Sequence, residues 1–234
     1  MAHYLWYPFA LVAFFSVFLT IIFRLEKRMV WPFGELERTA YYGDPTGYGA
    51  RWVQDAVQAG FLLLGWARDI KGPMIRASYA LLVSPARDTF VVIGVGTVIN
   101  IPVQSTTLHT PTADGRSFNT TDNQNSVQID LSRNWTNQLA FEPNFDKLLQ
   151  KHREWIQSTG LLPRYFTRDR EYAEFRALRE EHFHSMERAG LIRFIDPSCA
   201  RFQFTLSGAA KTATWGYLVG MVRKLSHGRF PRSA

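Results

Sequence analysis

The longest pattern in the chain is an unbroken run of apolar residues near its N-terminus. From Tyr4 to Phe23 the sequence contains no charged residue. An α-helix rises about 1.5 Å per residue, so this run would span about 30 Å, the thickness of the hydrocarbon core of a bilayer. A signal peptide would have a basic start and a shorter apolar core, whereas this run is long and bulky charged residues follow it. We therefore expect a transmembrane anchor over residues 1–30.

Aromatic and basic side chains flank this run, as they do at membrane–water interfaces. The positive charge lies only on the C-terminal side, so the positive-inside rule places the N-terminus outside and the rest of the chain in the cytoplasm. We expect a single-pass protein of the cell (inner) membrane. The residues expected at the membrane interface are Tyr4, Trp6, Tyr7, Arg24, Lys27, Arg28 and Trp31.

Small and hydroxyl-bearing residues share one face of the predicted anchor. Ala13, Ser16 and Thr20 recur at helical spacing. Such stripes let two membrane helices approach closely, so we expect this face to pack against a span of another integral membrane subunit. The alternative is that the hydroxyl groups bond back to their own helix.

After the anchor, residues 31–50 are rich in Gly, Pro and Tyr and predict an irregular connector. Residues 51–142 then predict one helix followed by an antiparallel β-meander, because short apolar runs alternate with turn residues and no helix lies between them. The helix is expected over 51–59. The strands are expected over 61–66, 77–83, 89–95, 98–108 and 126–131.

Residues 143–234 predict a helical subdomain. Apolar residues at helical spacing indicate helices over 145–159 and 169–189, each followed by a glycine. A hairpin over 191–206 follows, and Ser207 is the expected N-cap of a last helix that runs to about Leu225. The predicted fold class is α+β, with a transmembrane helix, a β-meander and a helical C-terminal part.

The net charge of +7 is concentrated at the two ends of the chain. Beyond Asp196 there are basic residues and no acid. A basic tail beside an anionic leaflet gains about 1 kcal/mol per Lys or Arg. We expect it to bind anionic lipid or an acidic protein surface; solvated charges that only aid solubility are the alternative. The docking residues would be Lys211, Arg223, Lys224, Arg229 and Arg232.

Two short motifs are candidate sites of chemistry. Gly94 and Gly96 follow a strand-like run, but Ile99 replaces the third glycine of a dinucleotide-binding fingerprint, so a bulge or turn is expected. Glu181 and His184 form a Glu-x-x-His pair, but di-iron bundles need two such helices. We therefore predict no cofactor and no metal ion.

Nucleophilic catalysis has no motif in the sequence. The single cysteine, Cys199, is expected in a hairpin turn, away from any helix N-terminus that would stabilise a thiolate. We therefore predict no catalytic residue.

The order of elements near the C-terminus is reminiscent of a winged-helix unit. A nucleic-acid reader of that kind would carry a basic recognition helix before the hairpin. Five glutamates interrupt the arginines of the helix over 169–189, which lowers its affinity for a phosphate backbone. We expect no nucleic-acid partner.

The predicted anchor and the basic tail, together with the absence of a catalytic motif, favour one function. We expect an accessory or structural subunit, not an enzyme, that stabilises a larger membrane complex such as an electron-transport or photosynthetic assembly. One alternative is a tethered enzyme whose site gathers His152, His182 and His184 with nearby glutamates. The other is a tethered regulator that binds nucleic acid.

Overall fold

The computed structural model describes residues 6–40, 43–44, 47–68, 75–98, 101–122, 134–140 and 142–214, with the backbone alone at 6–12, 75, 98 and 101. The chain forms two compact units. The larger unit comprises Trp31–Ser126 and Arg133–His182, and the smaller unit comprises Met1–Val30, Val127–Ser132 and Phe183–Ala234. Each unit is described by itself.

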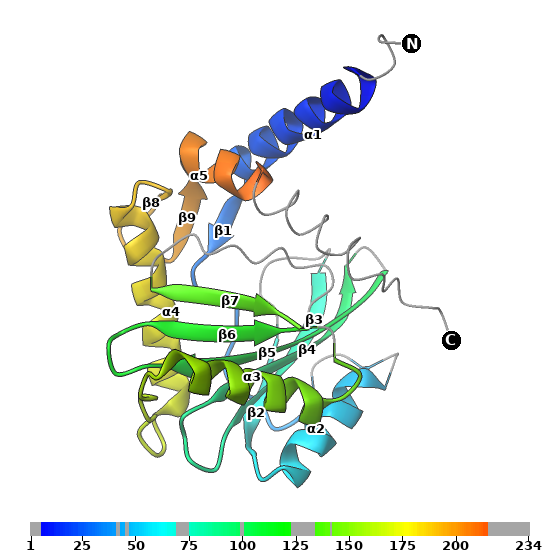
Figure 1. Ribbon diagram of the computed structural model, residues 1–234, viewed down its shortest axis with the longest axis vertical. Helices are drawn as coiled ribbons and strands as arrows, with labels where there is room; N and C mark the ends of the chain where they lie inside the picture. Colours follow the sequence, from blue (N-terminus) through cyan, green and yellow to red (C-terminus); the bar gives the residue numbers. More distant parts are fainter. Residues whose placement is uncertain are drawn as a thin grey trace. The chain divides into compact units, whose positions relative to one another are not determined.

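A six-stranded sheet forms the centre of the larger unit (Figure 1). Its strands lie in sequence order, and all neighbours are antiparallel except the last pair, β6 and β7, which are parallel. The strands are β2 (Leu62–Arg68), β3 (Ile75–Val83), β4 (Phe90–Val98), β5 (Ile101–Pro111), β6 (Ser117–Thr121) and β7 (Trp135–Leu139).

The described part of the chain is thus α+β with a mixed sheet and five helices, and the prediction of a purely antiparallel meander is wrong. The strand expected over 126–131 falls outside the described residues. The last strand is instead β7, whose sequence Trp-Thr-Asn-Gln-Leu is mostly polar and carries no strong strand signal. Parallel pairing with β6 requires the intervening chain to return to the same end of the sheet, which local sequence patterns cannot reveal.

One face of the sheet packs against α2 (Tyr48–Gln58) and α3 (Phe145–Thr159). Alternate residues of the strands, such as Leu82, Ile93 and Leu108, point to this face and are fully buried with Phe145 of α3. The helix α3 has the bounds that its sequence predicts. The side chain of Asn144 caps its N-terminus by accepting from the backbone N–H of Lys147, and Gly160 ends it in the left-handed conformation.

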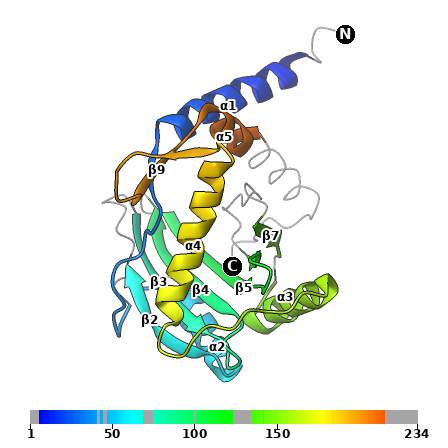
Figure 2. The ribbon, with the colours of Figure 1, turned by 90° about the vertical axis from the view of Figure 1, so that its left-hand side faces the viewer.

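The other face of the sheet packs against α4 (Glu171–Arg188), which crosses it in Figure 2. The rings of Phe90 on β4 and Phe175 on α4 are stacked with centroids 4.1 Å apart. The helix begins in the larger unit and ends in the smaller one. Its spacing places Phe175, Arg179 and His182 on one side of the helix.

Gly94 and Gly96 lie inside β4, where pairing with both neighbours is regular, so the predicted bulge or turn is wrong. The two glycines are required by close packing across the sheet. A Cβ at Gly96 would lie 2.1 Å from the carbonyl oxygen of Arg76, and one at Gly94 would lie 2.9 Å from the ring of Tyr79. The irregularity of the sheet lies instead in β2, between Leu63 and Gly65.

The described part of the smaller unit contains a three-stranded sheet of order β1-β9-β8, the helices α1 and α5, and the end of α4. Its core holds aromatic residues of α1 and β9, among them Phe23 and Phe204, whose rings meet edge to face. The N-cap of its last helix is Thr205 and not the predicted Ser207, because the Thr205 hydroxyl accepts from the N–H of Gly208. The elements are α1 (Trp6–Leu25), β1 (Lys27–Met29), β8 (Ile192–Phe194), β9 (Arg201–Phe204) and α5 (Leu206–Lys211).

Among the residues that the structure describes, no helix is long and apolar enough to cross a membrane. The predicted transmembrane anchor is therefore contradicted, together with the single-pass inner-membrane location and the outside N-terminus. One side of α1 is also covered by protein, since Leu19 and Phe23 pack into the core of the smaller unit.

Candidate functional site

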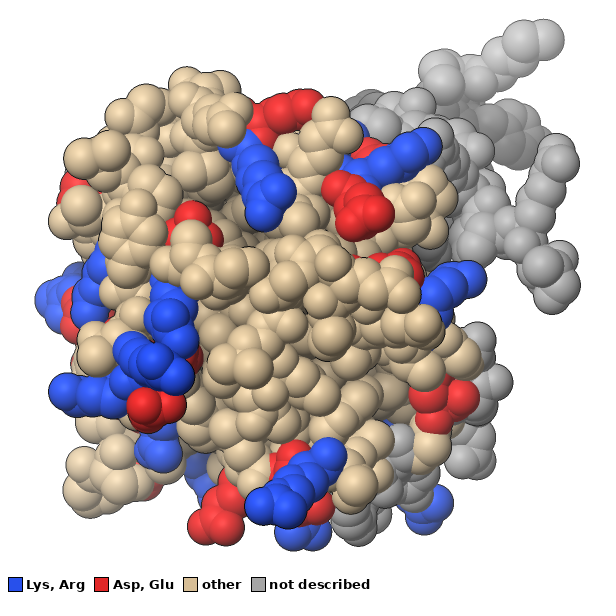
Figure 3. Space-filling view, turned by 90° about the horizontal axis from the view of Figure 1, so that it is seen from below, with Lys and Arg blue, Asp and Glu red and all other residues tan. Residues whose placement is uncertain are grey.

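The most exposed apolar surface in the described residues lies on α1. Seven large apolar side chains of this helix are 42–69% exposed. Exposed large apolar side chains of the larger unit are fewer and more scattered in sequence. The face seen in Figure 3 carries Lys and Arg around its edge. Contiguous apolar surface of this kind marks interaction sites. The α1 face consists of Phe14, Phe15, Val17, Phe18, Ile21, Ile22 and Leu25.

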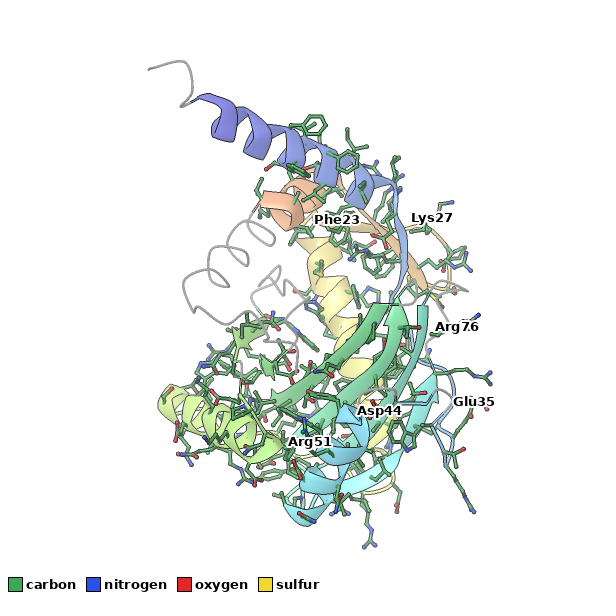
Figure 4. The ribbon with its side chains drawn as sticks, turned by 90° about the vertical axis from the view of Figure 1, so that its right-hand side faces the viewer. Phe23, Lys27, Glu35, Asp44, Arg51 and Arg76 are labelled. Carbon is green, nitrogen blue, oxygen red and sulfur yellow. The ribbon has the colours of Figure 1, made fainter. Side chains whose placement is uncertain are left out.

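The predicted packing stripe on this helix lies mostly on another side. Ala13 is exposed, but Ser16 and Thr20 are half-buried. The hydroxyl of Thr20 donates to the carbonyl oxygen of Ser16 at 2.7 Å, the bond that the alternative interpretation expects. Phe23, labelled in Figure 4, extends this side into the core beside α5. Whether Ala13, Ser16 and Thr20 contact another helix stays a prediction.

Two of the predicted interface residues that follow α1, Arg28 and Trp31, make contacts within the protein, whereas Lys27 is exposed. Arg28 donates from Nε to Glu26 at 2.9 Å, and its guanidinium lies over the rings of Phe23 and Phe204. The ring of Trp31 packs in the larger unit, where its Nε1 donates to the hydroxyl of Tyr172 at 3.3 Å. Residue 4 is outside the described residues, and the side chains of Trp6 and Tyr7 are not described.

The predicted basic docking surface is largely outside the described residues. Lys211, the last residue of α5, is exposed. Arg223, Lys224, Arg229 and Arg232 lie beyond the described part of the chain. Docking of this tail on anionic lipid or on an acidic protein stays a prediction.

His152 of α3 lies in the interior of the larger unit. Its Nδ1 is 2.8 Å from the hydroxyl of Thr120 and its Nε2 is 2.9 Å from that of Thr110. Burial lowers the pKa of His152 to about 4, so the ring is neutral at physiological pH. Both ring nitrogens are occupied by hydroxyl groups of the sheet, which suits a structural role.

The other two predicted histidines do not share one environment. His182 stacks on the ring of Trp135 in the larger unit, with centroids 4.5 Å apart. His184 belongs to the smaller unit, where its ring lies 4.9 Å from that of Phe194 and its Nδ1 is 3.8 Å from Glu187. Within the described residues no group of three or more His, Cys, Asp or Glu side chains is placed to hold a metal ion.

A row of polar side chains crosses the face of the sheet that carries α4. His109 of β5 pairs with Asn119 of β6, which pairs with Asn137 of β7. The Asn119 amide donates from Nδ2 to the carbonyl oxygen of Thr136 and to Oδ1 of Asn137. Its Oδ1 therefore faces His109 Nδ1, 2.5 Å away, so Nδ1 carries the proton and donates. The lone pair of the neutral ring is then on Nε2.

Arg179 of α4 supplies a positive charge near this row. Its guanidinium lies over the rings of Trp31 and Phe33, at 6.0 Å and 5.8 Å from their centroids. Burial lowers the pKa of Arg179 to about 10, which leaves it charged at physiological pH. Burial, together with the Arg179 charge, lowers the pKa values of His109 and His182 to about 3.

A half-buried carboxyl group, that of Asp122, joins α2 to the sheet. The hydroxyl of Tyr48 donates to Asp122 and lies 2.8 Å from the hydroxyl of Thr106, whose backbone N–H also donates to Asp122. Burial raises the pKa of Asp122 to about 6, although these hydrogen bonds favour the carboxylate. Burial and the nearby Asp122 also raise the pKa of the Tyr48 hydroxyl. Figure 4 shows Asp44 and Arg51 at the start of the same helix, where Asp44 accepts from the N–H of Ala50.

Sequence reasoning found His182 but missed the residues around it. His109 and Asn119 belong to two strands that are otherwise rich in threonine, so neither residue is part of a recognisable motif. Arg179 is one of several arginines in a charged helix. A signal was present, because Phe175, Arg179 and His182 recur at helical spacing. Only strand pairing could show that this side of the helix meets His109.

Comparison with protein-family models, with curated proteins and with solved structures finds no match for this chain.

Proposed function

We propose that the chain is an accessory, non-catalytic component of a larger assembly, and that it binds a partner protein through the apolar face of α1. The exposure of the seven large apolar side chains on that face is the observation that carries the proposal. Removing a side chain of this size from water contributes about 1.5–3 kcal/mol, so covering several of them supplies a strong driving force for association.

The arrangement of α1 within its own unit supports this proposal. The opposite side of the helix packs on α5 and β9, so the unit itself positions the exposed face. Phe14 and Phe18 lie one helical turn apart with parallel rings, 6.2 Å between centroids. Aromatic side chains held in this way are typical anchors of protein interfaces.

The test is purification of the tagged chain from its native cells, combined with site-specific crosslinking. A photo-crosslinker at Ile21 should join the chain to one partner protein recovered in fixed stoichiometry, whereas one at Leu162, which is even more exposed and lies in the larger unit, should not. The double variant F14Q/F18Q should lose that partner. The matched variant V57Q/L162Q, which alters exposed apolar residues of the larger unit, should retain it.

Three results would overturn the proposal. The wild-type chain elutes alone, or F14Q/F18Q keeps the partner, or the Ile21 crosslinks form only with lipid. Circular dichroism of both variants shows whether they remain folded, and folding should be retained because each altered side chain is exposed.

A further inference from the structure

The apolar face of α1 carries charge at one end only. From Ala13 to Phe23 the sequence has no charged residue, whereas Arg24 and Lys27 follow directly after this stretch. Helical spacing puts Arg24 one turn from Ile21, at the edge of the apolar face. Lys27, the first residue of β1, is exposed (Figure 4). A protein that covers the apolar face therefore meets two cations at the C-terminal end of α1.

We propose that the partner of α1 presents an apolar groove with carboxylate groups at one end, and that these carboxylates pair with Arg24 and Lys27. The inference rests on the proposed function, because it names the chemistry of the surface that covers the same face. It also gives the complex a direction. The acidic end of the groove lies against the C-terminal end of α1, and the apolar part lies against Phe14 and Phe18.

The acidic side chains in the described part of the smaller unit have other partners within that unit. Glu26 accepts from both Nε and Nη2 of Arg28. Glu187 lies 3.8 Å from Nδ1 of His184. Asp196 accepts from two backbone N–H groups of its own hairpin. These three are all the Asp and Glu residues in that part of the unit, so none of its carboxylates is left to neutralise the end of α1.

Arg24 and Lys27 keep their charges available. Among the described residues, neither side chain forms an ion pair or a side-chain hydrogen bond. Arg24 is half-buried beside the apolar face, and Lys27 is exposed next to it. The described part of the smaller unit holds seven Lys or Arg residues against three Asp or Glu residues. The charge that a partner meets there is therefore positive.

Covering the apolar face makes a carboxylate necessary in the partner. Arg24 stands at the edge of that face, so a protein that excludes water from Ile21 also removes water from the guanidinium group. A cation that loses its water is costly to bury unless a charged or polar partner replaces it. The planar guanidinium group matches the two oxygens of a carboxylate. Lys27 lies further out, where an opposite charge chiefly speeds association.

The first experiment measures association kinetics with the partner protein that the crosslinker at Ile21 recovers. The double variant R24E/K27E should associate about tenfold or more slowly than wild type at about 0.1 M salt, because attraction becomes repulsion. The difference should shrink at about 1 M salt, where the screening length falls from about 10 Å to about 3 Å. The apolar contacts of Phe14 and Phe18 are unchanged in this variant.

A charge reversal elsewhere on the chain provides the matched comparison. K147E/R153E makes the same change of charge on α3, where both side chains are exposed, and should associate like wild type. Circular dichroism shows whether each variant is folded. If R24E/K27E does not fold, R24Q/K27Q removes the two charges without adding acid, and it should still associate more slowly than wild type.

Carbodiimide crosslinking tests for the carboxylate directly, because this reagent joins a lysine amine to a carboxyl group that it already contacts. Lys27 should couple to an Asp or Glu residue of the partner, whereas Lys147, exposed on α3, should not. K27R keeps the positive charge but offers no amine. It should therefore associate like wild type and lose the crosslink.

Three results would overturn this inference while leaving the proposed function in place. R24E/K27E associates as fast as wild type, or K147E/R153E slows association equally, or Lys27 couples to no carboxyl group of the partner. In each case F14Q/F18Q still loses the partner. If the wild-type chain elutes alone, or F14Q/F18Q keeps the partner, the proposed function fails and this inference fails with it.

Discussion

Arg87, in the turn between β3 and β4, and Glu171, in the first turn of α4, form an ion pair with 3.0 Å between Nε and Oε1. The two ends of this pair differ in burial, since the Glu171 side chain is 5% exposed and that of Arg87 is 31% exposed. The pair joins the start of α4 to the sheet, 84 residues away in sequence. A carboxylate at this position also interacts favourably with the helix dipole.

The unequal burial predicts unequal effects of removing each partner. R87M leaves the Glu171 carboxylate buried without its cation and should lower the free energy of unfolding by about 3 kcal/mol. E171Q leaves Arg87 partly solvated and should cost about 1 kcal/mol. Urea denaturation measures both values. A larger loss in E171Q than in R87M would show that the helix terminus, rather than the buried charge, dominates.

The raised pKa of Asp122 predicts that the free energy of unfolding falls as pH rises. Burial raises the pKa of Asp122 from 3.8 to about 6, so the folded state holds its proton more tightly than the unfolded state does. Its contribution to stability is therefore present below about pH 4 and lost as pH rises through 6. We expect D122N to be more stable than wild type by about 1–2 kcal/mol at pH 7.5 and similar to it near pH 4. Thermal unfolding at the two pH values tests this, and a less stable D122N at pH 7.5 would contradict it.

The burial of His152 predicts a pH dependence of the opposite sign, in which the free energy of unfolding falls as pH falls. Burial lowers the pKa of His152 from 6.5 to about 4, so protonation favours the unfolded state as pH falls below 6.5. The free energy of unfolding of the wild-type chain should fall between pH 6.5 and pH 4, with up to about 3 kcal/mol from this residue. In H152Q that fall should be smaller by this share, although stability at pH 7 drops because Thr110 and Thr120 lose their partner. Chemical denaturation at pH 7, 5.5 and 4 provides the measurement, and an unchanged slope in H152Q would rule out this origin.

Gly96 predicts a steric limit in the sheet. An added methyl group would lie 2.1 Å from the Arg76 carbonyl oxygen and 2.6 Å from the Ala77 Cα, so β3 and β4 would have to separate. G96A should therefore lower the free energy of unfolding by at least about 2 kcal/mol. G43A is the matched control, because no described residue lies within 4 Å of its added methyl group, and it should change stability by less than about 0.5 kcal/mol. Equal stability of the two variants would mean that the strands adjust without cost.

Helices were more predictable from sequence than the order of the sheet. The bounds of α3 follow from apolar residues at helical spacing between Asn144 and Gly160, and all of these are local signals. The parallel pairing of β6 with β7 depends on contacts between segments that are remote in sequence. The glycines of β4 were misread for the same reason, since what requires Gly96 is the backbone of another strand.

The apolar run at the N-terminus shows the limit of a pattern without its surroundings. Its hydrophobicity and length predicted a transmembrane anchor, and the described side chains of α1 instead divide into an exposed face and a side that packs on α5 and β9. Hydrophobicity measures how strongly a segment avoids water. It does not state which apolar surface will cover the segment.

By itself, the sequence determined much of the local structure, namely the approximate bounds of α2, α3 and α4, most of the strands and the turn of Ser84–Asp88, because each depends on interactions between near neighbours. Only the tertiary structure decided that the sheet is mixed and which helices cover each of its faces. It also decided that His109 lies close to Asn119, Arg179 and His182. Those residues are separated by up to 73 positions in the chain. Their proximity follows from strand pairing and from the packing of α4 on the sheet, and neither is encoded in any single segment.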